Sequence, residues 1–334
     1  MNKTVSFSKH SVNVFFHILT RCNLTCRHCY INPSQHGNEI LPLETIINWL
    51  GAFTNTNQKA NLIFLGGEPT LHPELGHAIK AANQMGFASV TIDTNGYLFC
   101  DILNKITPED VDFISFSLDG ATRKTNDLIR GSGCYDTCVS GIKQAVQLGF
   151  NTSLIFTVSN ENIHELTLMP QLINDLGIDR FFIQVIGMRG KSAKPQKDRL
   201  QVDRNTWLSL IPAVADQAAD LGITVTYPKV FLNDSDVFEC AGRVADNYFI
   251  FPNGRVYRCP LCEDYPLHSL EFINNRLTKR GKITEHDLFA LDIAEGCVMN
   301  KLIQPDNLSY DKDGTPEYKV ACCLLKEEVP AVKK

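Results

Sequence analysis

The sequence predicts an α/β protein in which a partial (β/α)6 barrel is followed by a small, cysteine-rich extension. Six segments rich in β-branched and aromatic residues alternate with amphipathic helical patterns in residues 12–221. Cysteine, glycine, asparagine and aspartate residues cluster directly after the carboxyl ends of these six segments. In a barrel all six loops meet at one mouth, whereas an open doubly wound sheet spreads them along an edge. We therefore favour an incomplete, TIM-like barrel.

The expected elements follow in strict alternation, which favours right-handed crossovers and a parallel sheet. Strands are predicted at Val12–Leu19, Ala60–Leu65, Ser89–Asp93, Phe113–Leu118, Thr152–Val158 and Phe181–Ile186. Helices are predicted at Leu43–Phe53, Pro73–Met85, Leu98–Ile106, Tyr135–Leu148, Ile163–Leu176 and Arg204–Leu221. Several helical patterns stop at a glycine, the residue that most easily adopts the left-handed cap that ends a helix.

The composition changes near Thr226, and we expect a core domain of residues 1–226 and an extension of residues 227–334. Only short strands are predicted in the extension, at Asn247–Phe251 and Arg255–Tyr257, joined by a turn at Pro252-Asn253-Gly254. With so few apolar runs, a bound metal cluster would supply part of its stability. Residues 326–334 have the composition of a frayed polar tail.

Composition and charge exclude several classes of protein. A chain of 334 residues with 44% hydrophobic content is typical of a globular protein with an ample core. The net charge of -5 gives no basis for nucleic-acid or anionic-membrane partners. We expect a cytoplasmic protein, because neither a signal peptide nor a transmembrane-length apolar run is evident. Twelve cysteines in a reducing compartment then indicate metal ligands and not disulfides.

The most informative segment is the loop after the first strand, where Cys22, Cys26 and Cys29 are spaced Cys-x3-Cys-x2-Cys. Three thiolates can hold three irons of a [4Fe-4S] cluster, and the fourth iron then stays open to an exogenous ligand. An open coordination position distinguishes a reactive metal site from a structural one. A zinc site completed by His28 or His36 is the alternative, although structural zinc sites commonly pair two Cys-x2-Cys knuckles.

The spacing and flanking residues of this loop resemble the cluster loop of the radical S-adenosylmethionine (radical SAM) superfamily. Gly66-Gly67-Glu68-Pro69, after the second strand, resembles the GGEP motif of the same superfamily. The resemblance implies that the open iron binds the amino and carboxylate groups of SAM. It also implies that residues Gly66 to Pro69 hydrogen-bond the methionyl ammonium, with Glu68 shaping the turn.

Loops after the third and fourth strands resemble those that meet SAM and, farther out, the substrate in these enzymes. The candidates there are Thr94, Asn95, Ser117 and Asp119. Period-two alternation places Ser115 and Ser117 on one face of a strand, which we expect to be the inner face of the barrel. Asp119 is alternatively a turn residue before a glycine.

Three further residues are weaker cofactor candidates. Arg130 lies in a segment resembling one found in the subfamily with auxiliary clusters and can clamp a carboxylate of SAM or substrate; the alternative is a surface ion pair with Asp127. Gln184 and Arg189, on and after the sixth strand, are candidates for adenine or carboxylate contacts. Cys134 follows a glycine-rich loop and is a candidate hydrogen-atom donor to a substrate radical.

The cysteines of the extension resemble the auxiliary-cluster region of the SPASM and twitch subfamilies. They are Cys240, Cys259, Cys262, Cys297, Cys322 and Cys323. Cys240 followed by Gly254-x4-Cys259 matches the characteristic first pair, whereas the usual Cys-x2-Cys-x5-Cys core is absent. Six cysteines are too few to ligate two clusters fully. We expect one auxiliary [4Fe-4S] cluster, held by Cys240, Cys259 and two of the other four.

The resemblance implies an enzyme that reductively cleaves SAM to a 5'-deoxyadenosyl radical, which removes a hydrogen atom from the substrate. The electron would come from a donor such as flavodoxin or ferredoxin. We favour a peptide substrate in ribosomal natural-product biosynthesis. The alternatives are dehydrogenation or epimerisation of a small molecule such as a sugar, aminocyclitol or tetrapyrrole, and a non-catalytic iron-sulfur or zinc protein.

Overall fold

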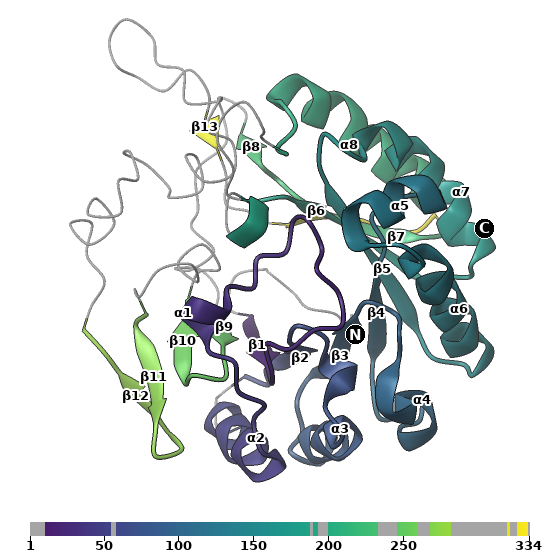
Figure 1. The fold of residues 1–334 in the computed structure, drawn as a ribbon. Coiled ribbons are helices and arrows are strands. Elements are labelled where there is room, and N and C mark those ends of the chain that lie inside the picture. The colour runs from purple at the N-terminus through teal and green to yellow at the C-terminus, as the bar shows by residue number, and fades with distance from the viewer. Residues whose placement is uncertain are drawn as a thin grey trace, which may run out of the picture.

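One sheet of twelve strands frames the molecule, in the order β12-β11-β10-β9-β1-β2-β3-β4-β5-β6-β7-β14 (Figure 1). The structure is a computed structural model that describes residues 11–54, 58–187, 190–192, 200–232, 246–258, 268–281, 319–320 and 326–332. Within this part of the chain the sheet is not closed, because its terminal strands β12 and β14 each pair on one side only. The predicted partial α/β barrel is confirmed.

The barrel strands pair in parallel, each with the next along the chain. They are β1 (Val12–His17), β2 (Asn61–Leu65), β3 (Ser89–Thr94), β4 (Phe113–Ser117), β5 (Thr152–Val158), β6 (Arg180–Val185) and β7 (Thr224–Pro228). The first six lie within two residues of their predicted bounds. Their carboxyl ends therefore open on one mouth, as expected.

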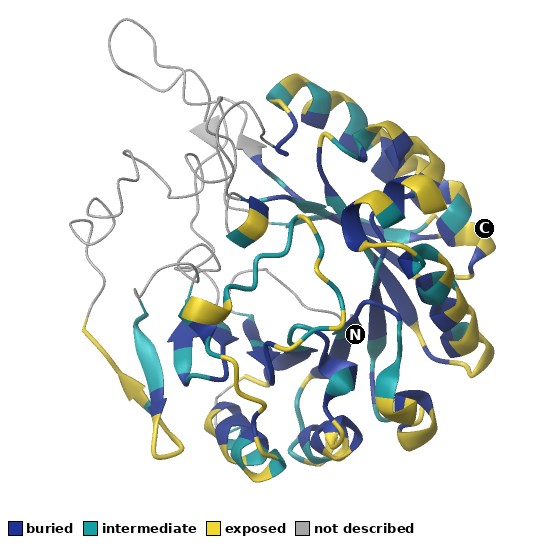
Figure 2. Cartoon of the chain, viewed as in Figure 1, coloured by how far each residue is buried: buried dark blue, intermediate teal, exposed yellow. Residues whose placement is uncertain are grey.

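Helices connect these strands and cover the outside of the sheet (Figure 1). They are α2 (Leu43–Leu50), α3 (Leu75–Gln84), α4 (Ile102–Lys105), α6 (Cys134–Gln147), α7 (Met169–Asp175) and α8 (Arg204–Asp220). Their apolar faces pack on the sheet; α8, for example, buries Trp207, Ile211 and Val214. Figure 2 shows the corresponding division, with exposed residues on the outer faces of the helices.

Short elements complete the barrel, and all of them except Gly51–Phe53, which extends α2, follow the carboxyl end of a strand. They are α1 (Pro33–His36), α5 (Arg123–Arg130) and the 3-10 turns Gly51–Phe53, Pro69–Leu71, Phe99–Asp101, Ile163–Leu168 and Gly190–Ser192. The helix α5 was not predicted, because only two of its residues, Leu128 and Ile129, are apolar. Its amino end is capped by the Thr122 side chain, which accepts a hydrogen bond from the main-chain N–H of Thr125.

Strands of the extension continue the barrel sheet at both edges. On one side β9 (Asp246–Ile250) pairs in parallel with β1, and β10 (Arg255–Tyr257), β11 (Leu270–Ile273) and β12 (Arg276–Lys279) follow as antiparallel neighbours. The predicted β9 to β10 hairpin is thus confirmed. A separate two-stranded ladder joins β8 (Phe231–Leu232) to β13 (Lys319–Val320).

The expectation of a polar tail from residue 326 is wrong for residues 326–329. These residues form β14 (Lys326–Val329), which pairs antiparallel with β7. Main-chain pairing outweighs the polar composition here, and Glu328 adds an ion pair to Arg180 with an oxygen to nitrogen distance of 2.5 Å. Because the strand runs antiparallel, its first residue lies beside Pro228, at the mouth end of β7.

A row of three asparagine side chains and one serine crosses the inner face of four neighbouring strands, at the end of the barrel opposite the mouth. The Asn13 amide donates to Asn247 Oδ1 at 2.8 Å, Asn61 donates to Asn13 Oδ1 at 3.0 Å, and Ser89 Oγ donates to Asn61 Oδ1 at 2.8 Å. Buried polar groups need such partners, so this asparagine ladder favours a single register for β9, β1, β2 and β3.

No helix in the described ranges has both the length and the apolar character needed to cross a membrane.

Candidate functional site

The loop that follows β1 presents its three cysteines toward the barrel. Burial alternates along it: Arg21, Asn23, Thr25 and Arg27 are exposed, whereas the residues between them are half-buried. Cys22, Cys26 and Cys29 are all free thiols, and all three line one cavity. The alternation gives the loop an inner face that carries Cys22 and Cys26 and an outer face that carries the arginines, and Cys29 follows it.

The Gly66-Gly67-Glu68-Pro69 segment packs edge-on against the start of this loop. Gly67 N–H donates to Leu19 O, and Glu68 N–H donates to Arg21 O, each at 3.0 Å. A Cβ atom on Gly67 would lie 2.3 Å from Arg21 O and 2.4 Å from Thr20 O, closer than real Cβ contacts come. Glycine is required here because two main-chain segments approach each other directly.

Glu68 is buried, and both of its carboxylate oxygens accept hydrogen bonds within the protein. Oε1 accepts from Thr70 N at 3.0 Å, Thr70 Oγ1 at 2.6 Å and Thr94 Oγ1 at 2.8 Å, while Oε2 accepts from Asn95 N at 2.7 Å. Burial raises the pKa of this carboxyl, and the hydrogen bonds oppose the rise. These contacts tie the loop after β2 to the loop after β3.

Asn95 carries this connection on to the cysteine loop. Its Nδ2 donates to Asn23 Oδ1 at 2.8 Å and lies 3.8 Å from Cys22 Sγ. The carboxylate of Glu68 therefore positions, through Asn95, the first of the three cysteines.

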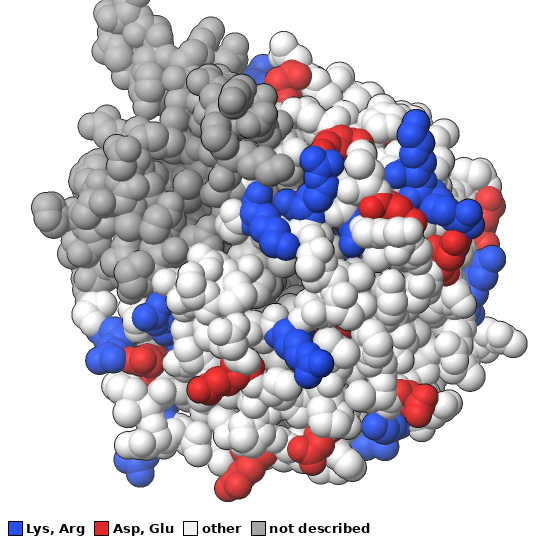
Figure 3. Space-filling model, in the orientation of Figure 1, with Lys and Arg blue, Asp and Glu red and all other residues white. Residues whose placement is uncertain are grey.

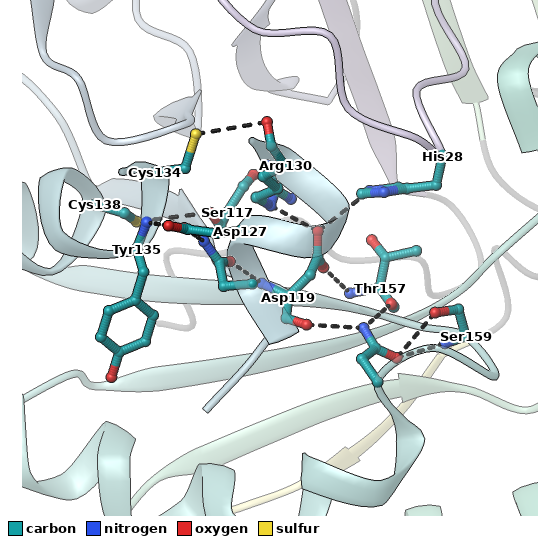
Figure 4. A network of polar contacts seen from close by, with 12 residues as sticks. His28, Ser117, Asp119, Asp127, Arg130, Cys134, Tyr135, Cys138, Thr157 and Ser159 are labelled. Atoms are coloured by element: carbon teal, nitrogen blue, oxygen red, sulfur yellow. Dashed lines mark hydrogen bonds and ion pairs between the residues drawn. The ribbon is translucent and has the colours of Figure 1, made fainter. Parts of the chain in front are cut away.

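A second buried carboxylate, Asp119, joins α5 to the cysteine loop (Figure 4). Its Oδ2 lies 2.6 Å from Arg130 Nε and 3.3 Å from His28 Nε2, and its Oδ1 accepts from Thr157 N at 2.8 Å. Burial alone would lower the pKa of Arg130, but the facing Asp119 carboxylate raises it, so the guanidinium stays charged. Arg130 pairs with Asp119 and not with Asp127, whose carboxylate accepts from the N–H groups of Gly133 and Tyr135.

The two networks flank a cavity of about 330 Å³ at the barrel mouth. Its wall contains the three cysteines, main chain of the glycine turn and most of the predicted cofactor residues. The predicted residues that line it are Cys22, Cys26, Cys29, Gly66, Gly67, Glu68, Thr94, Asn95, Ser117, Arg130 and Gln184. Asp119 lies behind Arg130, and Pro69 is buried at the start of the following turn.

Among the wall residues that sequence reasoning missed are Asp93, His17 and Lys326. Asp93 is half-buried on β3, and burial together with the neighbouring Glu68 raises its pKa to about 7 despite a hydrogen bond with Ser115. His17 stacks on Phe251 and bonds Tyr30 OH at 2.7 Å through Nε2. Lys326, on β14, donates to Gln184 Oε1 at 2.7 Å. Asp93 lies two residues after the buried Thr91, and therefore on the same face of β3, a pattern that the sequence already contains.

Cys134 does not face the cavity. It is buried at the start of α6, with Sγ 3.5 Å from the main-chain oxygen of Arg130 (Figure 4). Its Sγ also lies 3.7 Å from Tyr97 OH. Its role as a hydrogen-atom donor stays a prediction. Arg189 and the cysteines predicted for the auxiliary cluster lie outside the described residues; these cysteines are Cys240, Cys259, Cys262, Cys297, Cys322 and Cys323.

Burial disfavours the thiolate form of two of the three loop cysteines. Burial raises the pKa of Cys22 to about 11 and also raises that of Cys26, so both prefer the neutral thiol in the absence of a cation. Metal ligation requires thiolates, and a bound cluster supplies the positive charge that these sites lack. Within the described residues, no group of three or more His, Cys, Asp or Glu side chains lies close enough together to hold a single metal ion.

Comparison with known proteins identifies relatives of the barrel. Residues 16–173 match the family described as the Radical SAM superfamily. A probable GTP 3',8-cyclase from Saccharolobus islandicus is 31% identical over 185 residues, which cover 54% of this chain and 59% of that protein. An Fe-coproporphyrin III synthase from Methanosarcina barkeri is 28% identical over 198 residues, covering 58% of this chain and 48% of that protein. The alignments thus span about half the length of these relatives.

Among solved structures, Streptococcus suis SuiB has a similar fold, with a TM-score of 0.63 at 16% identity. The superposition covers 89% of this chain and 67% of SuiB. SuiB has also been solved bound to S-adenosylmethionine and bound to the precursor peptide SuiA. At this identity the likeness establishes the fold.

Proposed function

We propose that this chain is a radical SAM enzyme that acts on a peptide; its residues 16–173 match the Radical SAM superfamily. The superfamily's cofactors are a [4Fe-4S] cluster and SAM. When bound and reduced by one electron, they supply a 5'-deoxyadenosyl radical that removes a hydrogen atom from the substrate. The protein's part is to hold both groups and to keep water and competing partners away.

One observation carries the SAM-cleaving activity: the three cysteines and the glycine turn line the same cavity. In this proposal Cys22, Cys26 and Cys29 ligate three irons. Gly66 and Gly67 let main-chain groups approach the methionine end of SAM, because no side chain stands between. Arg130, charged and held by Asp119, binds a carboxylate of SAM or substrate.

We further propose one auxiliary [4Fe-4S] cluster in the extension, with Cys240, Cys259 and two of Cys262, Cys297, Cys322 and Cys323 as ligands. The flanking described residues support this assignment. Cys259 follows β10 by two residues, and Cys323 precedes Lys326, a wall residue of the cavity, by three. Three residues of extended chain span at most about 11 Å. A cluster bound by Cys323 would therefore lie beside the cavity, where it can exchange an electron with a bound substrate.

The fold likeness to SuiB, which extends over most of this chain, supports a peptide substrate and a role in natural-product biosynthesis. The second candidate is a small molecule, and the 31%-identical relatives named as GTP 3',8-cyclases favour it. The two candidates differ in which molecule loses a hydrogen atom to the 5'-deoxyadenosyl radical. With deuterated substrates, label appearing in 5'-deoxyadenosine from a precursor peptide, and not from GTP or coproporphyrin, would support the peptide. The reverse result would overturn it.

SAM cleavage itself can be tested without a substrate. After anaerobic cluster reconstitution, dithionite and SAM should yield 5'-deoxyadenosine, and the Cys26→Ala variant should yield almost none. Production by that variant at the wild-type rate would refute the assignment. In a Cys22→Ala/Cys26→Ala/Cys29→Ala variant, about four remaining irons per chain support one auxiliary cluster, whereas about eight require two.

A further inference from the structure

Each of the three cluster cysteines has a basic residue beside it, two from the loop itself and one from the segment after β6. Arg21 precedes Cys22 and Arg27 follows Cys26. Lys191 comes from a distant segment, and its N–H donates to Cys29 O at 2.8 Å. All three side chains are exposed. We call this set, Arg21, Arg27 and Lys191, the basic collar.

The collar is a local reversal of the overall charge. The chain has a net charge of -5, yet residues 20–38 contain no Asp or Glu. Arg27 forms an ion pair with Glu161 at 2.6 Å, while no ion pair of Arg21 or Lys191 occurs among the described residues. Figure 3 shows Lys and Arg side chains over the middle of the face on which this loop lies. Like charges gathered on one surface attract partners of opposite sign.

The collar is also held in place. Gly190, before Lys191, has a φ of +55°, and a Cβ there would lie 2.5 Å from Cys29 O. Arg21 O accepts from Glu68 N–H, and Arg27 N–H donates to Ile129 O at 2.9 Å. The charged side chains therefore project from main chain fixed to three different parts of the barrel. A preformed charged surface needs little ordering when a partner binds.

We propose that the basic collar is the docking surface for the enzyme's electron donor, an acidic one-electron carrier of the ferredoxin type. This inference rests on the proposed SAM-cleaving function, which needs one electron per turnover. In the transfer the reduced carrier loses one electron and the [4Fe-4S] cluster gains it, with no bond made or broken. A carrier seated on the collar meets the outer face of the loop whose inner face holds the cluster.

The geometry favours an electron carrier over an acidic substrate. A substrate must reach the cavity, on the inner face of the loop, whereas the collar residues are exposed and are not among the described residues that line it. Electron transfer needs only close approach through the thin loop. Positioning by charge also suits a transient complex, because charge complementarity raises association rates more than it raises affinity.

The test compares two double variants of equal charge change. Arg21→Glu/Lys191→Glu reverses the collar but keeps the Arg27 to Glu161 pair, and Lys80→Glu/Lys143→Glu reverses two exposed lysines on α3 and α6. The dissociation constant of an oxidised acidic ferredoxin, measured at about 20 mM salt on the cluster-loaded protein, should rise about tenfold for the collar variant only. It should rise by a smaller factor for Arg21→Gln/Lys191→Gln, which removes charge without repulsion. At about 0.5 M salt the difference should vanish, because the Debye length then falls well below 10 Å.

A kinetic arm separates docking from chemistry. The rate of 5'-deoxyadenosine formation with reduced ferredoxin, divided by the rate with methyl viologen radical cation, should fall about tenfold in the collar variant. Equal effects of both double variants, or none, would overturn the collar as the docking surface. Weakened binding of an acidic precursor peptide without weakened ferredoxin binding would assign the collar to the substrate and also overturn the proposal. Absence of product with viologen in the wild type would instead refute the proposed function.

Discussion

Replacing Glu68 by glutamine tests whether one buried carboxylate organises the cavity. The carboxylate accepts four hydrogen bonds, and every partner is a donor. A glutamine amide has one acceptor oxygen, so its NH2 group must face at least one of these donors. The least costly orientation keeps the three bonds at Oε1 and loses the 2.7 Å bond from Asn95 N–H.

Losing a charge-assisted hydrogen bond and leaving a buried N–H without an acceptor costs about 2 to 4 kcal/mol. Burial of the charge, which raises the pKa of Glu68, offsets part of this cost in the variant. We therefore expect Glu68→Gln to lower the free energy of unfolding by about 2 kcal/mol. Since Asn95 contacts Asn23 and Cys22, the variant should also retain less iron after reconstitution.

Urea unfolding of the cluster-free protein measures the first effect, and iron per chain measures the second. Glu74→Gln, an exposed change at the start of α3, is the matched control and should alter neither quantity. If Glu68→Gln unfolds at the same urea concentration as the control and binds as much iron, the carboxylate does not hold the turn.

Three further variants probe other parts of the site. Gly67→Ala should lower the free energy of unfolding by about 2 kcal/mol or more, because the main-chain oxygens of Arg21 and Thr20 cannot move away from the added Cβ. Gly51→Ala is the control, because a Cβ atom there meets nothing within 4 Å. Asp119→Asn leaves the buried Arg130 guanidinium without a counter-charge, and the free energy of unfolding in urea should fall by about 3 kcal/mol. Asp136→Asn, which removes the partner of Arg123 in an exposed ion pair, is the control and should leave the free energy of unfolding almost unchanged. Asp93 has its pKa raised from 3.8 to about 7, so the folded state binds its proton more tightly. The free energy of unfolding should thus fall by about 2 kcal/mol between pH 4 and pH 7, half the full linkage value because the side chain is half-buried. In cluster-free Asp93→Asn this fall should be smaller by about the same amount, and an unchanged slope would contradict the assignment.

Local patterns sufficed to predict the barrel. Each of β1 to β6 is an apolar run flanked by turn residues, and parallel pairing between successive units follows from the alternation with helices. The seventh strand was missed because Thr224–Pro228 coincides with the change of composition at residue 226. Four of its five residues favour a strand, but only the pairing with β6 places it in the barrel.

Long-range pairing limited what could be predicted of the site. Cys22, Cys26, Cys29 and the Gly66 to Pro69 turn carry their spacing in the sequence, and the structure places them together. Lys326 enters the same cavity only because β14 adds to the edge of β7, a contact that no local pattern encodes. The partners of Glu68 and Asp119 were likewise invisible, since each network joins loops from three strands.

The asparagine ladder and the pairing of β9 with β1 determine when the site can be completed as the chain emerges from the ribosome. The strand that leads into the cysteine loop gains its second neighbour only after residues 246–250 have been synthesised, and Asn13 then meets Asn247, 234 residues away. His17 obtains its bond to Ile250 O at the same moment. Contacts of such separation form late, because long loops are slow to close. Cluster delivery should therefore succeed only on chains that have passed this point, and arrested shorter chains should remain iron-free.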